Sequence, residues 1–546
     1  MRRVARLLSK PPSSSRDRFE GNEFGLINAI KASDLAKFLL LYVEGKFVYR
    51  LKDGLGNNIL HMAVLTGNAS LVQGVLLFYE TDSNELTTQR NNHGQLAEDL
   101  AEGSIKLLFR QWKGELDVNL ELVCGMRYEF NGNAMRNTLN NTILLQKIPH
   151  LNKRSRVLVS LDGGGIRGLA SVQILKKLEQ GLSKPLIKYA DWMSGTSTGS
   201  YIALLMAQNK SLVDIQKSYL RLKNIIFKGM RPYNTEILEK SLKEILSTKP
   251  LSAIRRPKII IPTCVMHSAL PRMKLFRNYT IKPFENEILD ENDYSDPDKV
   301  EMWIAGRCSS AAPTYFTPYH GFIDGGIASN NPAMELMTEF FEYNYSKQLS
   351  SNFDKIKKGR EEVNVDTFND HIHSGNELLH SHAATLIDRI WPASELLKDT
   401  NLDDVGMSRH VPENIACVIS IGTGQWLNCG KLNEDSSALN SSTVSNVSPG
   451  RGNFIKKIGE LKSFLSIFIR QLTASEGLPV ERARSWCHSI GVPYFRFTPK
   501  LTIRVKLDDA SDVSIIQMIW DTEIYLRTEC MNEIKKITNF LQLMNG

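Results

Sequence analysis

Residues 192–199 read Trp-Met-Ser-Gly-Thr-Ser-Thr-Gly, and they are the most informative stretch of the chain. It places Ser197 at the centre of a Gly-x-Ser-x-Gly motif, after an apolar run and before the helix-like residues 201–206. A serine that leaves a strand and enters a helix through a tight turn presents its hydroxyl group as a nucleophile. Gly195 and Gly199 remove the Cβ atoms that would clash in such a turn. The stretch therefore predicts a nucleophile elbow on an α/β sheet.

The composition is that of a globular protein with two or three domains. The chain has 546 residues, of which 42% are hydrophobic and 23% are charged. The net charge of +8 is too diffuse for a nucleic-acid footprint, so we expect no nucleic-acid partner, but it favours an anionic membrane surface. Seven cysteines without regular spacing indicate a reducing compartment. We expect a cytoplasmic protein that associates peripherally with membranes.

The N-terminal residues 1–20 form a basic tail. They contain five arginines and no acidic residue before Asp17, which is similar to a mitochondrial transit peptide, so a mitochondrial location is the alternative. Residues 59–79 carry no charge and have the length of a membrane span. Because Gly67, Asn68 and Gln73 interrupt this stretch, we predict no transmembrane helix.

A repeated pattern explains the uncharged stretch better. Residues 56–63, a Gly-Asn turn and the apolar residues 71–77 resemble an ankyrin repeat. A second copy begins 38 residues later at Gly94, and a poorer copy precedes both. We predict a short all-α region of about three repeats over residues 21–112, with a surface for a protein partner. A plain helical cap is the alternative.

The sequence pattern of the remaining residues predicts one catalytic domain with an insertion. A polar linker is predicted over residues 113–155, a catalytic core over 156–345, a polar insertion over 346–410, and the C-terminal part of the catalytic domain over 411–546. Strand-like runs alternate with helical patterns within these boundaries, which predicts an α/β sheet. The runs are residues 156–161, 258–261 and 416–421.

A glycine-rich loop, residues 162–168, follows the first of these runs and precedes a helix. Its spacing satisfies the dinucleotide fingerprint Gly-x-Gly-x-x-Gly, for which Asp191 would have to bind the ribose. Because Asp191 leads directly into the serine turn, we favour an oxyanion hole built from backbone N–H groups at a helix N-terminus. The three candidate donors are Gly163, Gly164 and Gly165.

A serine nucleophile needs a base within hydrogen-bond reach. His61 lies in the repeat and His267, which follows a strand, is the best of a poor set of histidines, whereas Asp324 leaves a short apolar run directly into Gly325 and Gly326. An aspartate that acts as the base itself is therefore the leading hypothesis, and Ser197 and Asp324 would form a catalytic dyad.

The three glycine-bounded blocks, in this order, resemble the signature of the patatin-like phospholipase family. Secondary blocks agree with this resemblance, namely residues 274–279, 309–316 and 421–424. Together with the ankyrin-like repeats, the chain is similar to the calcium-independent, group VI phospholipase A2 enzymes. The resemblance is strong over residues 156–340, moderate over 411–540 and weak over 20–110. It implies a three-layer α/β/α hydrolase domain preceded by the short all-α region.

The resemblance also implies a role for each site residue. Ser197 would attack the acyl ester of a glycerophospholipid at a membrane surface, and Asp324 would accept its proton. The three loop glycines would stabilise the oxyanion, and Arg167 would support their loop or meet the lipid phosphate. Four further glycines would support the two turns, namely Gly195, Gly199, Gly325 and Gly326. No metal or other cofactor is implied, and burial is expected to raise the pKa of Asp324 so that it can act as a base.

Other functions use the same residues. A lipid acyltransferase or lysophospholipase would form the same acyl-enzyme, and a non-catalytic ankyrin scaffold would leave the dyad unused. Residues 453–472 form a basic amphipathic pattern that predicts a core-packing helix, with a calmodulin-binding or membrane-binding helix as the alternative. Homo-oligomerisation is a further expectation. A calcium-binding loop needs glycine at its sixth position and an oxygen ligand at its fifth. Counted from Asp290, the acidic residues 290–298 have Ser295 and Tyr294 there, so we predict no calcium site.

Overall fold

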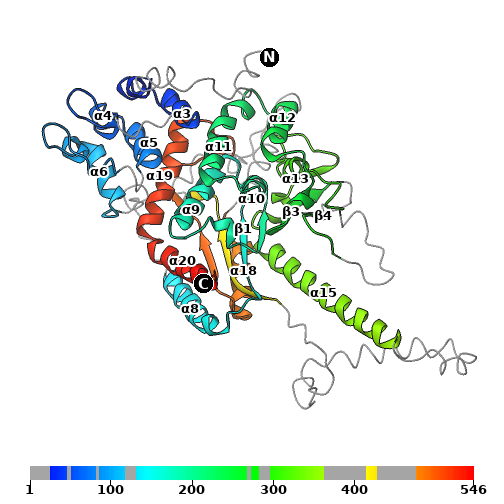
Figure 1. The fold of residues 1–546 in the computed structure, drawn as a ribbon. Coiled ribbons are helices and arrows are strands. Elements are labelled where there is room, and N and C mark those ends of the chain that lie inside the picture. Colours follow the sequence, from blue (N-terminus) through cyan, green and yellow to red (C-terminus); the bar gives the residue numbers. More distant parts are fainter. Residues whose placement is uncertain are drawn as a thin grey trace, which may run out of the picture. The chain divides into compact units, whose positions relative to one another are not determined.

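The computed structural model describes residues 25–45, 51–80, 85–116, 131–266, 272–281, 295–361, 413–426 and 475–545 (Figure 1). The chain divides into two compact units. The first comprises Met1–Thr280, Leu289–Thr338 and Ile415–Gly546, and the second comprises Ile281–Ile288 and Glu339–Asn414. All the predicted catalytic residues belong to the first unit.

A mixed seven-stranded sheet forms the centre of the first unit, in the order β4-β3-β2-β1-β6-β8, with β5 paired to β3. Strands β1, β2 and β3 are parallel, as are β6 and β8, while β4 and β5 run antiparallel to β3. The strands are β1 (Ser155–Leu161), β2 (Trp192–Gly195), β3 (Lys258–Val265), β4 (Arg272–Arg277), β5 (Phe322–Asp324), β6 (Asn414–Ile421) and β8 (Tyr494–Phe497). A separate pair joins β7 (Gln425–Trp426) to β9 (Lys500–Leu501). The prediction of an α/β fold is confirmed.

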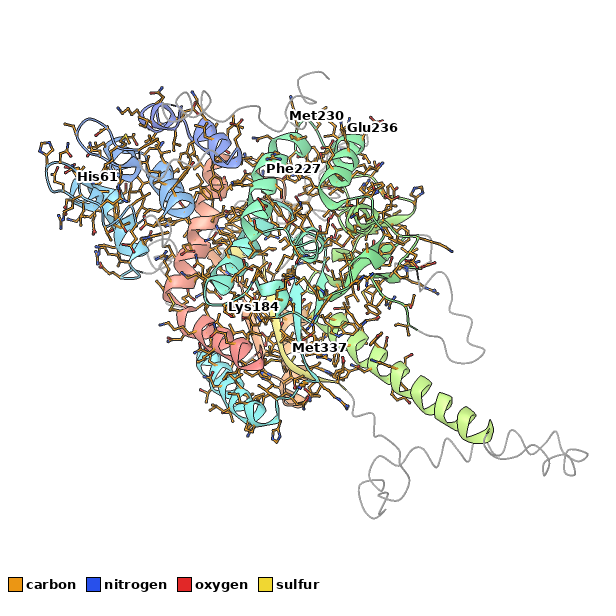
Figure 2. All side chains as sticks on the ribbon, in the orientation of Figure 1. His61, Lys184, Phe227, Met230, Glu236 and Met337 are labelled. Atoms are coloured by element: carbon orange, nitrogen blue, oxygen red, sulfur yellow. The ribbon has the colours of Figure 1, made fainter. Side chains whose placement is uncertain are left out.

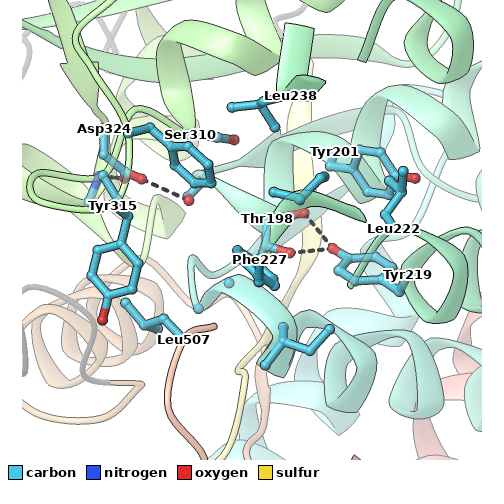
Figure 3. A pocket seen from close by; sticks show the side chains of 18 of the residues that line it. Thr198, Tyr201, Tyr219, Leu222, Phe227, Leu238, Ser310, Tyr315, Asp324 and Leu507 are labelled. Carbon is cyan, nitrogen blue, oxygen red and sulfur yellow. Dashed lines mark hydrogen bonds between the residues drawn. The ribbon is translucent and has the colours of Figure 1, made fainter. Parts of the chain in front are cut away.

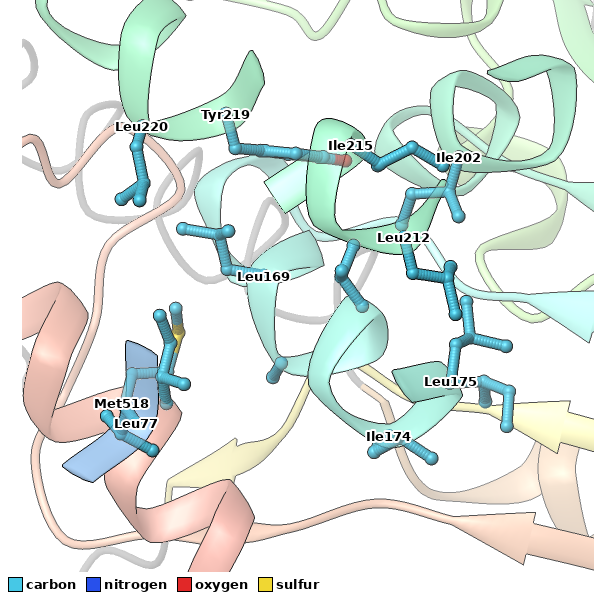
Figure 4. Close-up of a cluster of buried hydrophobic side chains, with 14 of the residues drawn as sticks. Leu77, Leu169, Ile174, Leu175, Ile202, Leu212, Ile215, Tyr219, Leu220 and Met518 are labelled. Carbon is cyan, nitrogen blue, oxygen red and sulfur yellow. The ribbon is translucent and has the colours of Figure 1, made fainter. Parts of the chain in front are cut away.

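Both faces of the central strands are covered, because almost every residue of β1, β2 and β6 is buried. The helices are α9 (Gly168–Gln180), α10 (Thr198–Ala207), α11 (Leu212–Ile226), α12 (Thr235–Leu246), α13 (Met302–Ser309), α14 (Gly326–Ser329), α15 (Ala333–Glu361), α18 (Leu478–Ser489), α19 (Asp512–Thr528) and α20 (Met531–Asn545). The same part of the chain also contains four short 3-10 helices, namely η2 (Ile148–His150), η3 (Gly165–Arg167), η4 (Leu186–Lys188) and η5 (Leu251–Ala253). Figure 4 shows the apolar core around α9, to which α10, α11 and α19 contribute.

The N-terminal part of the first unit consists of short helices. They are residues 25–31, α3 (Leu35–Val43), α4 (Ile59–Leu65), α5 (Ala69–Tyr79), η1 (Ala97–Leu100) and α6 (Gly103–Trp112). His61 lies on α4 (Figure 2). The rings of Trp112 and Trp520 stack with centroids 5.6 Å apart, so α6 is anchored to α19. None of the described helices combines the length and the apolar character of a membrane span.

Helices also occupy parts of the predicted linker and insertion. Helix α8 (Asn131–Lys147) lies within the predicted linker, and the Oδ1 atom of Asn140 accepts a hydrogen bond from the N–H of Tyr494 at 2.8 Å. Helix α15 extends to Glu361, inside the predicted insertion. The basic tail 1–20, the amphipathic pattern 453–472 and the rest of the insertion lie outside the described residues. The domain boundaries stay predictions.

Candidate active site

Ser197 occupies a strained turn between β2 and α10. Its backbone has φ +52° and ψ −118°, a conformation that non-glycine residues rarely adopt. A Cβ atom on Gly195 would lie 2.2 Å from the carbonyl oxygen of Gly199, and one on Gly199 would lie 2.3 Å from the carbonyl oxygen of Leu161. Both flanking positions therefore require glycine, and the turn has the geometry of a nucleophile elbow.

The hydroxyl group of Ser197 points at Asp324. Its Oγ atom donates a hydrogen bond to Asp324 Oδ2 at 2.8 Å, while the N–H of Gly326 donates to Asp324 Oδ1 at 2.7 Å. A Cβ atom on Gly325 would lie 2.2 Å from the carbonyl oxygen of Pro262, so the chain can turn there only with glycine. Ser197 and Asp324 thus have the geometry that proton transfer from hydroxyl to carboxylate requires.

The register of β3 explains why residues so distant in sequence meet. Strand β2 pairs with residues 258–260 of β3, and β5 pairs with residues 263–265. Strand β4 pairs with the opposite edge of β3, because Ile260 pairs with both β2 and β4, and Thr263 pairs with both β5 and β4. Strands β2 and β5 therefore follow one another along a single edge of β3 and run toward each other. Ser197 follows the end of β2 and Asp324 ends β5, so both lie at the interruption between these strands.

Burial makes the carboxyl group of Asp324 more basic. The loss of hydration on burial raises the pKa of Asp324 to about 6, although the hydrogen bonds from Gly326 and Ser197 favour the charged form and oppose this rise. A carboxylate with this pKa is a stronger base than an exposed aspartate and is still ionised at neutral pH.

The pH dependence of the reaction follows from this pKa. Below about pH 6 the carboxyl group of Asp324 holds a proton and cannot accept one from Ser197. We expect kcat/KM for a soluble ester to fall roughly tenfold per pH unit on the acidic side and to level off above pH 7. A rate that stays constant from pH 4.5 to pH 8 would exclude Asp324 as the base.

The glycine-rich loop presents two N–H groups rather than the predicted three. The N–H of Gly163 donates to the carbonyl oxygen of Asn330 at 3.1 Å, so it is not available to an oxyanion, and the prediction for Gly163 is wrong. The N–H groups of Gly164 and Gly165 have no hydrogen-bond partner among the described residues. Gly164, Gly165 and Ser197 line the same pocket, so these two N–H groups remain available to an oxyanion formed there.

A buried ion pair fixes the start of this loop. Arg496 on β8 contacts Asp162 through its Nη2 atom, 2.6 Å from Oδ2, and both side chains are almost completely buried. The Nδ2 atom of Asn331 donates to Asp162 Oδ1 at 2.7 Å. Arg496 was not predicted from the sequence, where its only signal is a charged residue within an otherwise aromatic strand. Losing one member of such a pair would leave an uncompensated buried charge.

The dinucleotide interpretation of this loop is wrong. Asp191 accepts a hydrogen bond from the N–H of Val157 at 2.9 Å and pairs with Arg256 at 2.6 Å. Val157 lies near the start of β1, whereas the glycines follow the end of that strand. Asp191 is therefore at the opposite end of β1 from the loop and cannot bind a ribose held there.

Arg167 contacts the glycine loop, which is one of its two predicted roles. Its Nε atom donates to the carbonyl oxygen of Gly164 at 3.4 Å. Burial lowers the pKa of this guanidinium to about 10, so it remains charged at neutral pH. The other predicted role, contact with a lipid phosphate, stays a prediction.

An apolar pocket opens at the dyad (Figure 3). Its lining includes Ser197 and Asp324 and continues along α11 and α12. Most of the further lining side chains are aliphatic or aromatic, namely Leu222 and Ile226 on α11, Leu238 and Leu242 on α12, and Phe227 and Phe316 in the segments that follow α11 and α13. Such a lining suits a hydrocarbon chain. Within the described ranges, no three His, Cys, Asp or Glu side chains are grouped closely enough to hold a metal ion.

The comparison with protein families agrees with this geometry. The family model described as patatin-like phospholipase matches residues 159–337, which contain the glycine loop, the elbow and Asp324. Residues 159–337 belong to the patatin-like phospholipase family. The patatin-like domain thus coincides with the part of the first unit that carries the dyad.

Several curated proteins to which the chain is similar are named as phospholipases. An intracellular phospholipase A2 of Caenorhabditis elegans is 33% identical over 391 residues, which are 70% of this chain and 29% of that protein. The 85/88 kDa calcium-independent phospholipase A2 of Mus musculus is 28% identical over 391 residues, which are 40% of its length. A cGAMP-activated phospholipase of Escherichia coli is 25% identical over 287 residues. The matched residues span less than half the length of the two animal proteins.

Proposed function

We propose that the chain is a calcium-independent phospholipase A2 that hydrolyses the fatty-acyl ester of glycerophospholipids. The observation that carries this proposal is the hydrogen bond of 2.8 Å between Ser197 and a buried Asp324 at the opening of an apolar pocket. The printed names of the two animal relatives, an intracellular and a calcium-independent phospholipase A2, support the same activity.

The reaction follows from the positions of these groups. Ser197 Oγ attacks the ester carbonyl carbon while Asp324 Oδ2 accepts its proton, and the N–H groups of Gly164 and Gly165 stabilise the oxyanion. Collapse of the tetrahedral intermediate expels the lysophospholipid alkoxide, which takes the proton back from Asp324. Water then attacks the acyl-enzyme while Asp324 accepts its proton, and this proton passes to Ser197 Oγ as the bond to the fatty acid breaks. The pocket holds the acyl chain throughout.

The proposed activity is tested on phospholipid vesicles with the full-length chain. We expect fatty acid and lysophospholipid to appear in equal amounts and at the same rate in EGTA as in calcium, because every step uses side chains and backbone groups of the chain itself. A rate that EGTA abolishes and calcium restores would contradict the proposal. Transfer of the acyl group to added lysolipid, in place of its release, would indicate an acyltransferase instead.

We propose further that the N-terminal helices form an ankyrin-like stack. Two corresponding turns support it: Gly56 and Gly94, 38 residues apart, have φ of +75° and +74°. Each turn carries the same backbone pairing, from Asp53 to Asn57 at 3.0 Å and from Asn91 to Gln95 at 2.9 Å. His61 connects the two, since its Nε2 atom lies 3.0 Å from the carbonyl oxygen of Gln95. Stacked repeats of this kind offer a surface to a protein partner.

The substrate implies where the protein works. Because glycerophospholipids reside in bilayers, we propose peripheral association with a membrane surface, for which the net charge of +8 is favourable.

A further inference from the structure

Ser309 makes hydrogen bonds to backbone groups beside both members of the proposed dyad. It is the last residue of α13 and is completely buried. Its Oγ atom donates to the carbonyl oxygen of Pro262 at 2.6 Å and accepts the N–H of Ser197 at 2.9 Å. Its own carbonyl oxygen accepts the N–H of Gly325 at 3.2 Å, beside Asp324. One residue thus contacts the nucleophile turn and the loop of the base.

The groups that Ser309 contacts lie where the edge of β3 is interrupted. Pro262 stands between the segments of β3 that pair with β2 and β5. Proline has no N–H group to donate, and it is tolerated inside this strand because no strand pairs with this edge of β3 at the interruption. Without Ser309, the carbonyl oxygen of Pro262 and the N–H of Ser197 would be buried without these partners, which costs free energy. A single hydroxyl group, donor and acceptor at once, satisfies both.

The strain at Ser197 makes this contact relevant to the reaction. A residue with φ of +52° keeps that conformation only when its surroundings determine it. The hydrogen bond from its N–H to Ser309 fixes the peptide plane that precedes Ser197, and therefore the direction of its Oγ atom. Ser310, the next residue, lines the pocket, whereas Ser309 does not. Ser309 therefore acts on the substrate only through Ser197.

We infer that Ser309 is a positioning residue, which holds the nucleophile in its strained conformation at hydrogen-bond distance from the base. The inference rests on the proposed function, because it assigns a role within the Ser197–Asp324 chemistry. The role is to orient a group and not to bind substrate, so it predicts an effect on kcat with little effect on KM.

The Ser309→Ala variant tests this role. We expect kcat for a soluble ester to fall roughly 10- to 100-fold, because a small misplacement of the nucleophile costs about that much, while KM changes less than about threefold. The rate of labelling by a fluorophosphonate should fall by the same factor. The apparent pKa near 6 should not move, because Asp324 remains buried.

The matched control is Ser171→Ala. Ser171 is also completely buried, and its Oγ atom donates to the carbonyl oxygen of Gly422 at 2.9 Å, but it has no contact with the dyad. We expect its kcat to stay within about threefold of the wild type. Ser309→Thr keeps the hydroxyl group and should restore most of the rate. Ser309→Cys, which fills the same space with a weaker hydrogen-bonding group, serves if the alanine variant does not fold, and should show the loss in kcat alone.

Two results would overturn the inference. One is a Ser309→Ala or Ser309→Cys protein with wild-type kcat, and the other is an equal loss of kcat in Ser171→Ala. Failure of the proposed function looks different, because then the wild type itself releases no fatty acid from phospholipid. In that case the labelling rate of Ser197 by fluorophosphonate still decides the role of Ser309.

Discussion

Replacing Ser197 by alanine is expected to abolish hydrolysis, with kcat lowered by at least about 10⁴-fold. The variant lacks the only atom that the proposed reaction uses as its nucleophile, while the backbone N–H groups of the glycine loop remain. The elbow should still form, because its shape depends on Gly195 and Gly199. Fatty-acid release from vesicles and covalent labelling by a fluorophosphonate measure the two consequences.

The control is a serine three residues earlier. Ser194 is buried in β2 and donates to the carbonyl oxygen of Pro332 at 3.2 Å, away from the carboxyl group of Asp324. Ser194→Ala should retain both hydrolysis and labelling. If Ser197→Ala still hydrolyses phospholipid at the wild-type rate, another group is the nucleophile and the assignment of the dyad fails.

Replacing Asp324 by asparagine is expected to lower kcat by roughly 10³- to 10⁴-fold and to stabilise the fold at neutral pH. An amide cannot accept the proton of Ser197, whereas its oxygen can still accept the N–H of Gly326. The stabilisation follows from the raised pKa. The folded state holds the proton of Asp324 more tightly than the unfolded state, whose pKa is near 3.8, so ionisation destabilises the fold.

The pH dependence of the free energy of unfolding tests this stabilisation. In the wild type, the contribution of Asp324 to the free energy of unfolding decreases as the pH rises from about 4 to about 6, and the loss at pH 7 is at most about 3 kcal/mol. Asp324→Asn carries no such loss. We expect its advantage in chemical denaturation to be largest at pH 7.5 and to shrink at pH 5. A variant that is less stable than the wild type at pH 7.5 would contradict the burial of an ionised Asp324.

The local parts of the site could be predicted from the sequence. The elbow around Ser197 and the turn after Asp324 each occupy a few consecutive residues, so the steric need for glycine is visible in the motif itself. The oxyanion loop was predicted less accurately. Whether Gly163 has a free N–H depends on Asn330, which is 167 residues further along the chain, and no local pattern reveals that pairing.

Contacts that join distant segments could not be predicted for the same reason. Arg496 reaches Asp162 across 334 residues, and Ser309 reaches Ser197 across 112 residues. Each is an ordinary residue type in its own segment, and its role exists only once the sheet has formed. The N-terminal stretch 59–79 was interpreted correctly as helical and interrupted, because Gly67 with φ of +72° separates α4 from α5.

Because β2 and β5 pair with the same edge of β3, the length of β3 between them sets the distance between Ser197 and Asp324. Nucleophile and base are 127 residues apart in sequence, yet their spacing is set by the few residues of β3 between the ends of β2 and β5. Length changes in the intervening connections leave this spacing untouched. One extra residue in β3 at Pro262 would push the two groups apart by about 3.3 Å, which exceeds the tolerance of a hydrogen bond. Loops of this domain are therefore free to diverge in evolution, while the length of one strand is not.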